Sequence, residues 1–95
     1  MDIKSVAHKG LRRLIEEGVT SGLPGAALTK IAAIVSFLEA APNVDAVKKL
    51  QVWKAHQLTG DRKGTWSLTV TRNWRITFDI SDENEIENLS FEDYH

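Results

Sequence analysis

The sequence predicts a small α+β domain, because helical periodicity fills its first half and strand periodicity fills its second half. As far as Gln51, apolar residues recur at steps of three and four residues, whereas from Trp66 onward they alternate with polar residues. Ninety-five residues are enough for one domain. We therefore assign residues 1–95 to a single compact domain, with two N-terminal helices packed on one face of a mainly antiparallel, twisted sheet.

The first elements expected are a short strand over residues 3–6 and a helix over residues 8–17. The helix is predicted because its apolar residues share one face while its charged residues lie elsewhere. These apolar residues are Leu11, Leu14 and Ile15. Gly18 follows directly, in the position where a C-cap glycine ends a helix.

A second, longer helix is predicted between Pro24 and Pro42. Its apolar residues recur at three- and four-residue steps, and they are Leu28, Ile31, Val35 and Leu38. Pro24 suits the first turn of this helix, and the helix should end before Pro42, because proline restricts the residue that precedes it. Asn43 or Asp45 is then expected to cap one short turn that runs through Leu50.

Strands are predicted in the second half of the chain. Residues 66–70 and 74–80 alternate apolar with polar side chains, which is typical of half-buried strands. The polar segment 81–85 predicts a turn, and residues 86–91 a last strand, while an earlier strand is expected to end at His56. The tryptophans at strand positions are expected in the core rather than as platforms for stacking bases, and they are Trp53, Trp66 and Trp74.

The net charge of −1 conceals a strong asymmetry along the chain. Residues 46–75 carry seven Lys and Arg against Asp61 alone, whereas residues 76–95 carry seven Asp and Glu with no Lys or Arg. The basic segment suits contact with a polyanion, and the acidic segment limits non-specific binding. The alternative is that the two segments are simply solvated strand faces of opposite sign.

Composition and spacing exclude several classes of protein. No cysteine is present, so neither a disulfide framework nor a cysteine-ligated metal is possible. No apolar run approaches the roughly 18 residues that a membrane span needs. The histidines lie far apart, and no metal-ligand spacing, glycine-rich phosphate loop, nucleophile elbow or helix-turn-helix pattern occurs. We expect a cytoplasmic protein that has no signal peptide and needs no metal or cofactor.

The residue types present suit cleavage of RNA without a metal. That reaction requires a base for the 2′-hydroxyl proton, cations for the phosphorane oxygens and an acid for the leaving 5′-oxygen. Imidazoles for the proton transfers are available at His56 and His95, although His56 has the alternative of a surface histidine that caps a turn. Asp93, Tyr94 and His95 contribute only if the last strand is held in place, because terminal residues are usually frayed.

Five residues are candidates for holding RNA or its phosphates, namely Lys54, Arg62, Lys63, Asn73 and Arg75. Strand alternation places Arg75 on the sheet face opposite the core, with a row of Ser and Thr that is open to solvent or substrate. Arg62 and Lys63 lie in a glycine-bounded turn, and they reach a phosphate only if that turn points toward this face. Asp61, in the same turn, is either an acceptor within the turn or an ion-pair partner for Arg75.

Three segments occur in the order and spacing of one known family. They are Gly60-Asp61-Arg62-Lys63-Gly64-Thr65-Trp66-Ser67, Asn73-Trp74-Arg75-Ile76-Thr77-Phe78 and Glu92-Asp93-Tyr94-His95. Together they resemble the HigB-type toxins of bacterial toxin–antitoxin (plasmid-maintenance) systems, within the RelE superfamily. The resemblance implies a RelE-like fold and a ribosome-dependent endoribonuclease that cleaves mRNA in the A site and so inhibits translation. It also implies a HigA-like helix-turn-helix antitoxin, through which alone the protein would contact DNA.

The resemblance assigns roles by position, and the most serious departure from the family concerns one position. Active-site roles fall on His56, Asp93, Tyr94 and His95, and RNA-positioning roles on Asn73 and Arg75. Relatives commonly read Pro-Leu-Lys-Gly-Asp-Arg after the histidine, whereas this chain has Thr59 where they have the lysine that contacts phosphate or the ribosome. Two alternatives therefore stay open: a ParE-like toxin that inhibits DNA gyrase by binding it, and an attenuated toxin that acts as an antitoxin-binding co-repressor.

Overall fold

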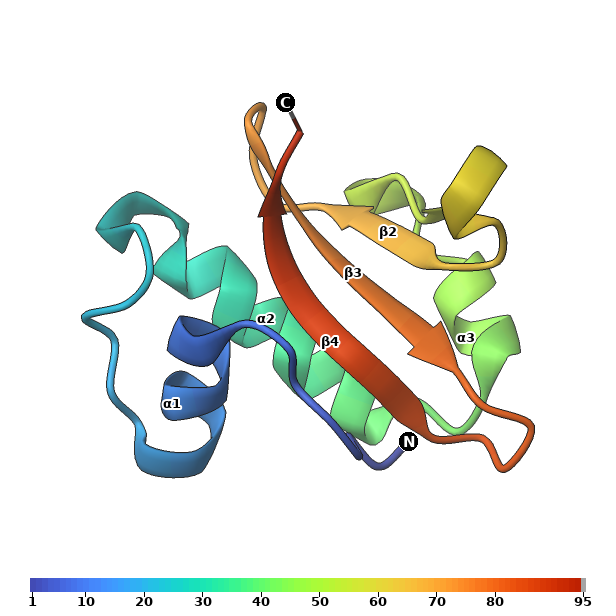
Figure 1. Cartoon of the computed structure of the whole chain (residues 1–95), viewed down its shortest axis with the longest axis horizontal. Coiled ribbons are helices and arrows are strands. Elements are labelled where there is room, and N and C mark those ends of the chain that lie inside the picture. The colour runs from blue at the N-terminus through green and yellow to red at the C-terminus, as the bar shows by residue number, and fades with distance from the viewer. Residues whose placement is uncertain (95) are drawn as a thin grey trace.

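The computed structural model describes residues 1–94 and has helices that precede an antiparallel sheet (Figure 1). The helices are α1 (Lys9–Glu17), α2 (Leu28–Ala40) and α3 (Val44–Lys48), and the 3-10 turns are η1 (Gly25–Ala27), η2 (Gln51–Trp53) and η3 (Gly60–Arg62). The strands are β1 (His56–Gln57), β2 (Trp66–Thr69), β3 (Trp74–Ile80) and β4 (Ile86–Asp93). The predicted α+β class is confirmed.

The sheet follows chain order, β1-β2-β3-β4, and each neighbouring pair of strands is antiparallel. Its register brings apolar residues opposite one another, as with Trp66 on β2 and Phe78 on β3. The strand expected over residues 3–6 is present only as isolated parallel bridges to β4, which join Ile3 to Ile86 and Val6 to Leu89. The chain therefore begins alongside the strand with which it ends.

The strand expected before His56 is wrong in its extent. Residues 51–53 form the 3-10 turn η2, and β1 begins at His56 instead of ending there. Lys54 lies between them with a left-handed backbone (φ 51°), which turns the chain out of η2 and into β1. Trp53 packs edge-on against Phe37 of α2, with 5.8 Å between ring centroids, so it belongs to the helical layer and not to the sheet.

The signals at the helix ends are largely those read from the sequence. Gly18 ends α1 with a φ of 71°, a conformation that glycine adopts without strain. Asn43 is the residue that caps α3, because its side-chain oxygen accepts a hydrogen bond from the Asp45 amide at 3.1 Å. Contrary to the prediction from the sequence, Pro24 does not lie in the first turn of α2, because the 3-10 turn η1 separates it from the start of α2 at Leu28.

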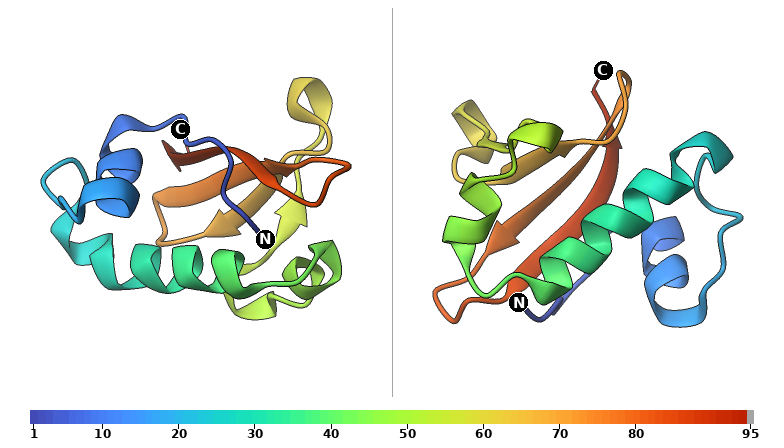
Figure 2. Two further views of the ribbon diagram at one scale, coloured as in Figure 1. Left: turned by 90° about the horizontal axis from the view of Figure 1, so that it is seen from below. Right: turned by 180° about the vertical axis from the view of Figure 1, so that it is seen from behind.

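The core lies between α2 and the sheet face that α2 covers (Figure 2). α2 runs across this face, and α1 lies beside the β4 edge (Figure 1). Fully buried core residues come from both layers, and they include Ile31, Ile34 and Leu38 on α2 and Leu68, Ile76, Phe78 and Leu89 on the strands. Removal of this apolar surface from water is the main term that stabilises the domain.

Candidate active site

The sheet face opposite α2 is polar, and strand register decides which side chains share it. Residues directly opposite each other on antiparallel strands place their side chains on the same face. One row across the sheet contains His56, Ser67, Thr77 and Ser90, and the next contains Thr69, Arg75 and Glu92. We call this surface, with Tyr94 just beyond β4, the polar face. The predicted position of Arg75 opposite the core is confirmed.

The polar face is not an open row of Ser and Thr, contrary to expectation. Ser67 is 0% exposed and Thr77 is 1% exposed. The side chain of Arg62 reaches from η3 over this part of the sheet, where its Nη2 donates to the Thr77 hydroxyl at 3.4 Å. The glycine-bounded turn does therefore point toward the polar face, which is the condition that a phosphate role for Arg62 requires.

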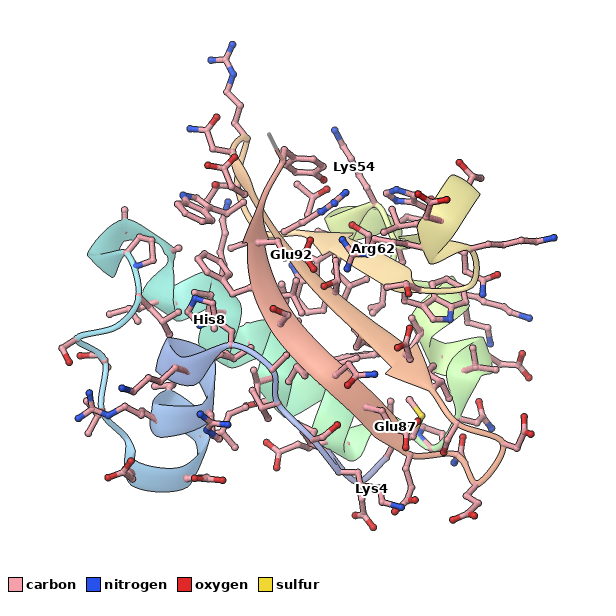
Figure 3. The ribbon with its side chains drawn as sticks, in the orientation of Figure 1. Lys4, His8, Lys54, Arg62, Glu87 and Glu92 are labelled. Atoms are coloured by element: carbon pink, nitrogen blue, oxygen red, sulfur yellow. The ribbon has the colours of Figure 1, made fainter. Side chains whose placement is uncertain are left out.

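A carboxylate, Glu92, lies at the centre of this face and faces Arg62 (Figure 3). Arg62 donates to it twice, from Nη1 to Oε1 at 2.7 Å and from Nη2 to Oε2 at 2.6 Å. Arg75 donates from Nη2 to Oε1 at 3.4 Å, and the Thr77 hydroxyl donates to Oε2. Two cations from separate elements thus converge on one anion, and Arg62 binds it in the planar paired geometry that arginine makes with carboxylates and phosphates.

The electrostatics of the polar face follow from these contacts. The hydrogen bonds from Arg62 are the main cause that lowers the pKa of Glu92 to about 2, with further lowering by the Thr77 hydroxyl and by the charges of Arg62 and Arg75. Burial opposes this change without reversing it. The hydrogen bond to Glu92 in turn raises the pKa of Arg62. Glu92 is therefore ionised throughout the physiological pH range.

Glu92 is the site residue that sequence reasoning missed. Among the two roles considered for Asp61, an ion pair with Arg75 is wrong, because the ion pair of Arg75 is made with Glu92. The sequence did contain a signal, since Glu92 lies directly opposite Arg75 in the register of β3 and β4. An acidic residue that faces a basic one across two predicted strands indicates such a pair.

His56 is exposed on the polar face, and its ring has one nitrogen engaged. Its Nδ1 lies 2.8 Å from the carbonyl oxygen of Lys54, and because a carbonyl only accepts, Nδ1 carries the proton. The other nitrogen, Nε2, is then the proton acceptor of the neutral imidazole. The Lys54 carbonyl thus holds His56 in the tautomer that a general base needs. The side chain of Lys54 is exposed.

The end of β4 is held in place, as the proposed role of its residues requires. The Tyr94 amide donates to the Asn73 carbonyl oxygen at 3.0 Å, and the Tyr94 and Thr69 hydroxyls lie 2.6 Å apart. The guanidinium carbon of Arg75 lies 5.2 Å from the centre of the Tyr94 ring, a cation–π contact. Tyr94 therefore belongs to the polar face, with Asn73 exposed at its rim, whereas His95 lies outside the described residues.

Two predicted site residues are not brought into this group. Asp93 lies opposite Trp74 in register, and successive strand residues alternate in direction, so its side chain leaves the strand on the other side from Glu92. Lys63 is exposed directly after η3, next to Arg62. The residues that the polar face does bring together are His56, Arg62, Arg75 and Tyr94, with Lys54 and Asn73 at its margin.

Two polar atoms of this face are buried and have no hydrogen-bond partner within residues 1–94, namely Ser67 Oγ and Arg75 Nε. Folded proteins rarely leave such groups unpaired, so their concentration here separates this face from the rest of the fold. Over the same residues, no group of three or more His, Cys, Asp or Glu is placed to hold a metal ion. No helix in the described part of the chain is long and apolar enough to cross a membrane.

The sequence matches a known toxin family and a curated relative. Residues 4–95 match the family described as HigB-like toxin, the RelE-like toxin of the type II toxin–antitoxin system HigB. Endoribonuclease HigB from Proteus vulgaris is 43% identical over 93 residues, which cover 98% of this chain and 99% of that protein. The match therefore extends over practically the whole length of both chains.

Two solved structures share the fold at lower sequence identity. YafQ from E. coli strain BL21(DE3) superposes with a TM-score of 0.65 at 15% identity, covering 98% of this chain and 92% of that one. The YoeB/ParE toxin from Agrobacterium tumefaciens gives a TM-score of 0.64 at 18% identity, with both chains fully covered. At these identities the likeness shows the fold alone.

Proposed function

The chain belongs to the HigB-like family of RelE-like toxins from type II toxin–antitoxin systems, and from this premise we propose that it is a ribosome-dependent endoribonuclease that cleaves mRNA in the A site. The 43% identity to an endoribonuclease over nearly the full length supports the reaction class. The observation that carries the proposal is the exposed His56 imidazole, with Nε2 as its proton acceptor, on the same face as Arg75 and Tyr94.

The proposed mechanism assigns each step to a group of this face. His56 takes the 2′-hydroxyl proton through Nε2, and the 2′-oxygen attacks the neighbouring phosphorus. Arg75 stabilises the charge that develops on the phosphorane oxygens. The bond to the 5′-oxygen then breaks, leaving a 2′,3′-cyclic phosphate and a 5′-hydroxyl. The proton for the leaving oxygen comes from Tyr94 or His95, and the Tyr94 hydroxyl lies on the polar face. Asp93, whose side chain leaves β4 on the other side, takes no direct part in this transfer.

The partners follow from the family and from this activity. A type II toxin has an antitoxin partner, and we propose that this antitoxin is a HigA-like helix-turn-helix protein in the cytoplasm. The ribosome and mRNA are the other proposed partners, and DNA is reached only through the toxin–antitoxin complex. Thr59 replaces the lysine of relatives at the exposed residue before η3, and the adjacent turn still supplies Lys63 and Arg62 as cations.

The test is to map the 5′ ends of cellular mRNA minutes after the protein is produced without its antitoxin. We expect cuts inside translated codons, and we expect His56→Gln to reduce their frequency by about 10²–10⁴-fold, because a positioned base contributes a factor of this size. His95→Ala is measured in parallel, and each variant must retain its thermal unfolding midpoint and antitoxin binding. Undiminished cuts in a folded His56→Gln protein would remove His56 from the mechanism.

The same experiment separates the alternatives. Growth arrest with intact mRNA and an SOS response would point instead to a gyrase inhibitor of the ParE type. Neither cuts nor arrest, in a folded protein that binds its antitoxin, would indicate an attenuated toxin whose remaining role is co-repression. Within residues 1–94, Nε2 of His56 has no hydrogen-bond partner, and this favours cleavage over both, because neither binding role needs a proton acceptor.

A further inference from the structure

The two arginines of the polar face are engaged to very different degrees, although both contact Glu92. Arg62 places both terminal nitrogens on the carboxylate at 2.6 and 2.7 Å, and a third contact reaches the Thr77 hydroxyl. Arg75 makes one contact to the carboxylate, at 3.4 Å, and its Nε has no partner within residues 1–94. Within the described residues, most of the five donors of Arg75 thus have no hydrogen-bond acceptor.

The two side chains also differ in exposure and in the element from which they stem. The Arg62 side chain is 44% exposed and stems from a turn, so without a partner it would be free to move in solvent. The Arg75 side chain is 18% exposed, stems from the middle of the sheet and lies over the Tyr94 ring. Glu92 is therefore the contact that brings Arg62 across the sheet, and it also limits the directions in which Arg75 can point.

The charges of Arg62, Arg75 and Glu92 favour the binding of one further anion. Two guanidinium groups and one carboxylate leave a net charge of +1, which one phosphodiester would neutralise. A phosphodiester also has the right geometry, because its two free oxygens match the paired N–H groups of a guanidinium. Arg75 has such N–H groups to offer at its terminal nitrogens, since its Nε is buried.

We propose that Glu92 is a positioning residue for the RNA phosphate site: it holds Arg62 across the polar face and orients Arg75, whose uncommitted donors bind a phosphate of the RNA. This inference rests on the proposed ribonuclease function and deepens it. Glu92 acts only through the arginines. Arg62, held in place by Glu92, forms one side of the phosphate site. The opposite arrangement, in which Glu92 competes with phosphate for the arginines, predicts the opposite sign for its removal.

Glu92→Gln removes the charge and keeps the shape of the side chain, and Glu87→Gln is its matched control. Glu87 is on the same strand, at its other end (Figure 3), and its side chain makes no hydrogen bond or ion pair within residues 1–94. Both variants therefore change the net charge by the same amount, so a general effect of charge on RNA binding appears equally in both. Only an effect through the arginines is specific to Glu92→Gln.

The experiment measures kcat and KM for mRNA cleavage on purified ribosomes, per folded molecule. We expect Glu92→Gln to lower kcat/KM by at least about 10-fold, which is less than the roughly 10²–10³-fold cost of losing a donor itself, because Arg75 remains present but is less well oriented. Glu87→Gln should stay within about twofold of the wild type. The kcat/KM of the double variant Arg62→Gln/Glu92→Gln should be no lower than that of the more impaired single variant, because both changes remove the same Arg62–Glu92 contact. An increase or no change in Glu92→Gln would overturn the proposal.

A second readout keeps the inference separate from the proposed activity. The NMR signal of the Arg75 Nε–H group is followed while a 2′-deoxy-substituted RNA oligonucleotide, which cannot be cleaved, is added. We expect the signal to shift in the wild type and in Glu87→Gln, and to shift far less in Glu92→Gln. If the wild type fails to cleave mRNA but shows this pattern, the proposed function fails and the phosphate site stands. If the wild type shows no shift, the phosphate site fails whatever the activity.

Discussion

The two faces of the sheet are built from the same strands and yet follow different rules. On the face toward α2, side chains such as Leu68, Ile76 and Phe78 are fully buried and apolar. On the polar face, the residues between them include Ser67 and Thr77, which are buried as completely but have polar groups to satisfy. One face is thus arranged for packing, and the other is arranged around charges and hydrogen bonds.

The comparison shows that burial has opposite consequences on the two faces. Burial of an apolar side chain removes hydrocarbon from water and stabilises the fold. Burial of a polar atom without a partner costs about 1–3 kcal/mol, and among residues 1–94 neither Ser67 Oγ nor Arg75 Nε finds one. The apolar face therefore supplies stability that offsets a polar face whose groups are fixed in place. Three predictions test this division.

The largest expected effect on stability comes from the apolar face. Phe78→Ala should lower the free energy of unfolding by about 3–5 kcal/mol, because it leaves a cavity among fully buried neighbours. Urea unfolding measures this loss. Val52→Ala is the control, since Val52 is 79% exposed and its truncation should change stability by less than about 0.5 kcal/mol. A loss below about 1 kcal/mol for Phe78→Ala would show that the core does not depend on this face.

The next effect concerns Glu92 and depends on pH. Its pKa is about 2 in the folded protein against an ordinary 4.5, so its contribution to stability is complete above pH 4.5 and is lost as the pH falls toward 2. The size at neutral pH should be about 2–3 kcal/mol. Urea unfolding of the wild type and Glu92→Gln at several pH values should give a stability difference that shrinks on acidification. A difference independent of pH would mean that Glu92 stabilises by packing and not by charge.

The smallest effect on stability is expected for Tyr94→Phe, for which we still expect a large effect on activity. The change removes the hydroxyl contact to Thr69, which lies at the exposed edge of the polar face and is worth at most about 1 kcal/mol. Cleavage of mRNA should nevertheless fall by about 10²-fold, because the hydroxyl is proposed to help protonate the leaving group. The cleavage kinetics and the free energy of unfolding in urea are measured on the same preparation and compared with those of the wild type. Unchanged cleavage would leave Tyr94 as a purely structural residue.

Local patterns in the sequence determined most of the secondary structure. Alternation of apolar and polar residues specifies β2 to β4, because a strand with one buried face has a period of two. The same alternation placed Arg75 on the face away from the core. Gly18 and Asn43 marked helix ends through the conformations and hydrogen bonds that those residue types favour. The family motif added His56 and the C-terminal residues, which no local period identifies.

The tertiary structure alone decided which distant residues meet. Arg62 and Glu92 are separated by thirty positions, and their contact depends on how η3 folds back over the sheet. Gly10 in the helical layer is a second example. A Cβ there would lie 2.4 Å from the Gly22 carbonyl oxygen, and no helical pattern indicates so close an approach. A periodic pattern records which side of an element is apolar, whereas contacts between elements depend on register, loop path and fit. In this protein, local patterns thus specify the elements and the face on which the chemistry lies, whereas the packing of those elements brings Arg62 to Glu92.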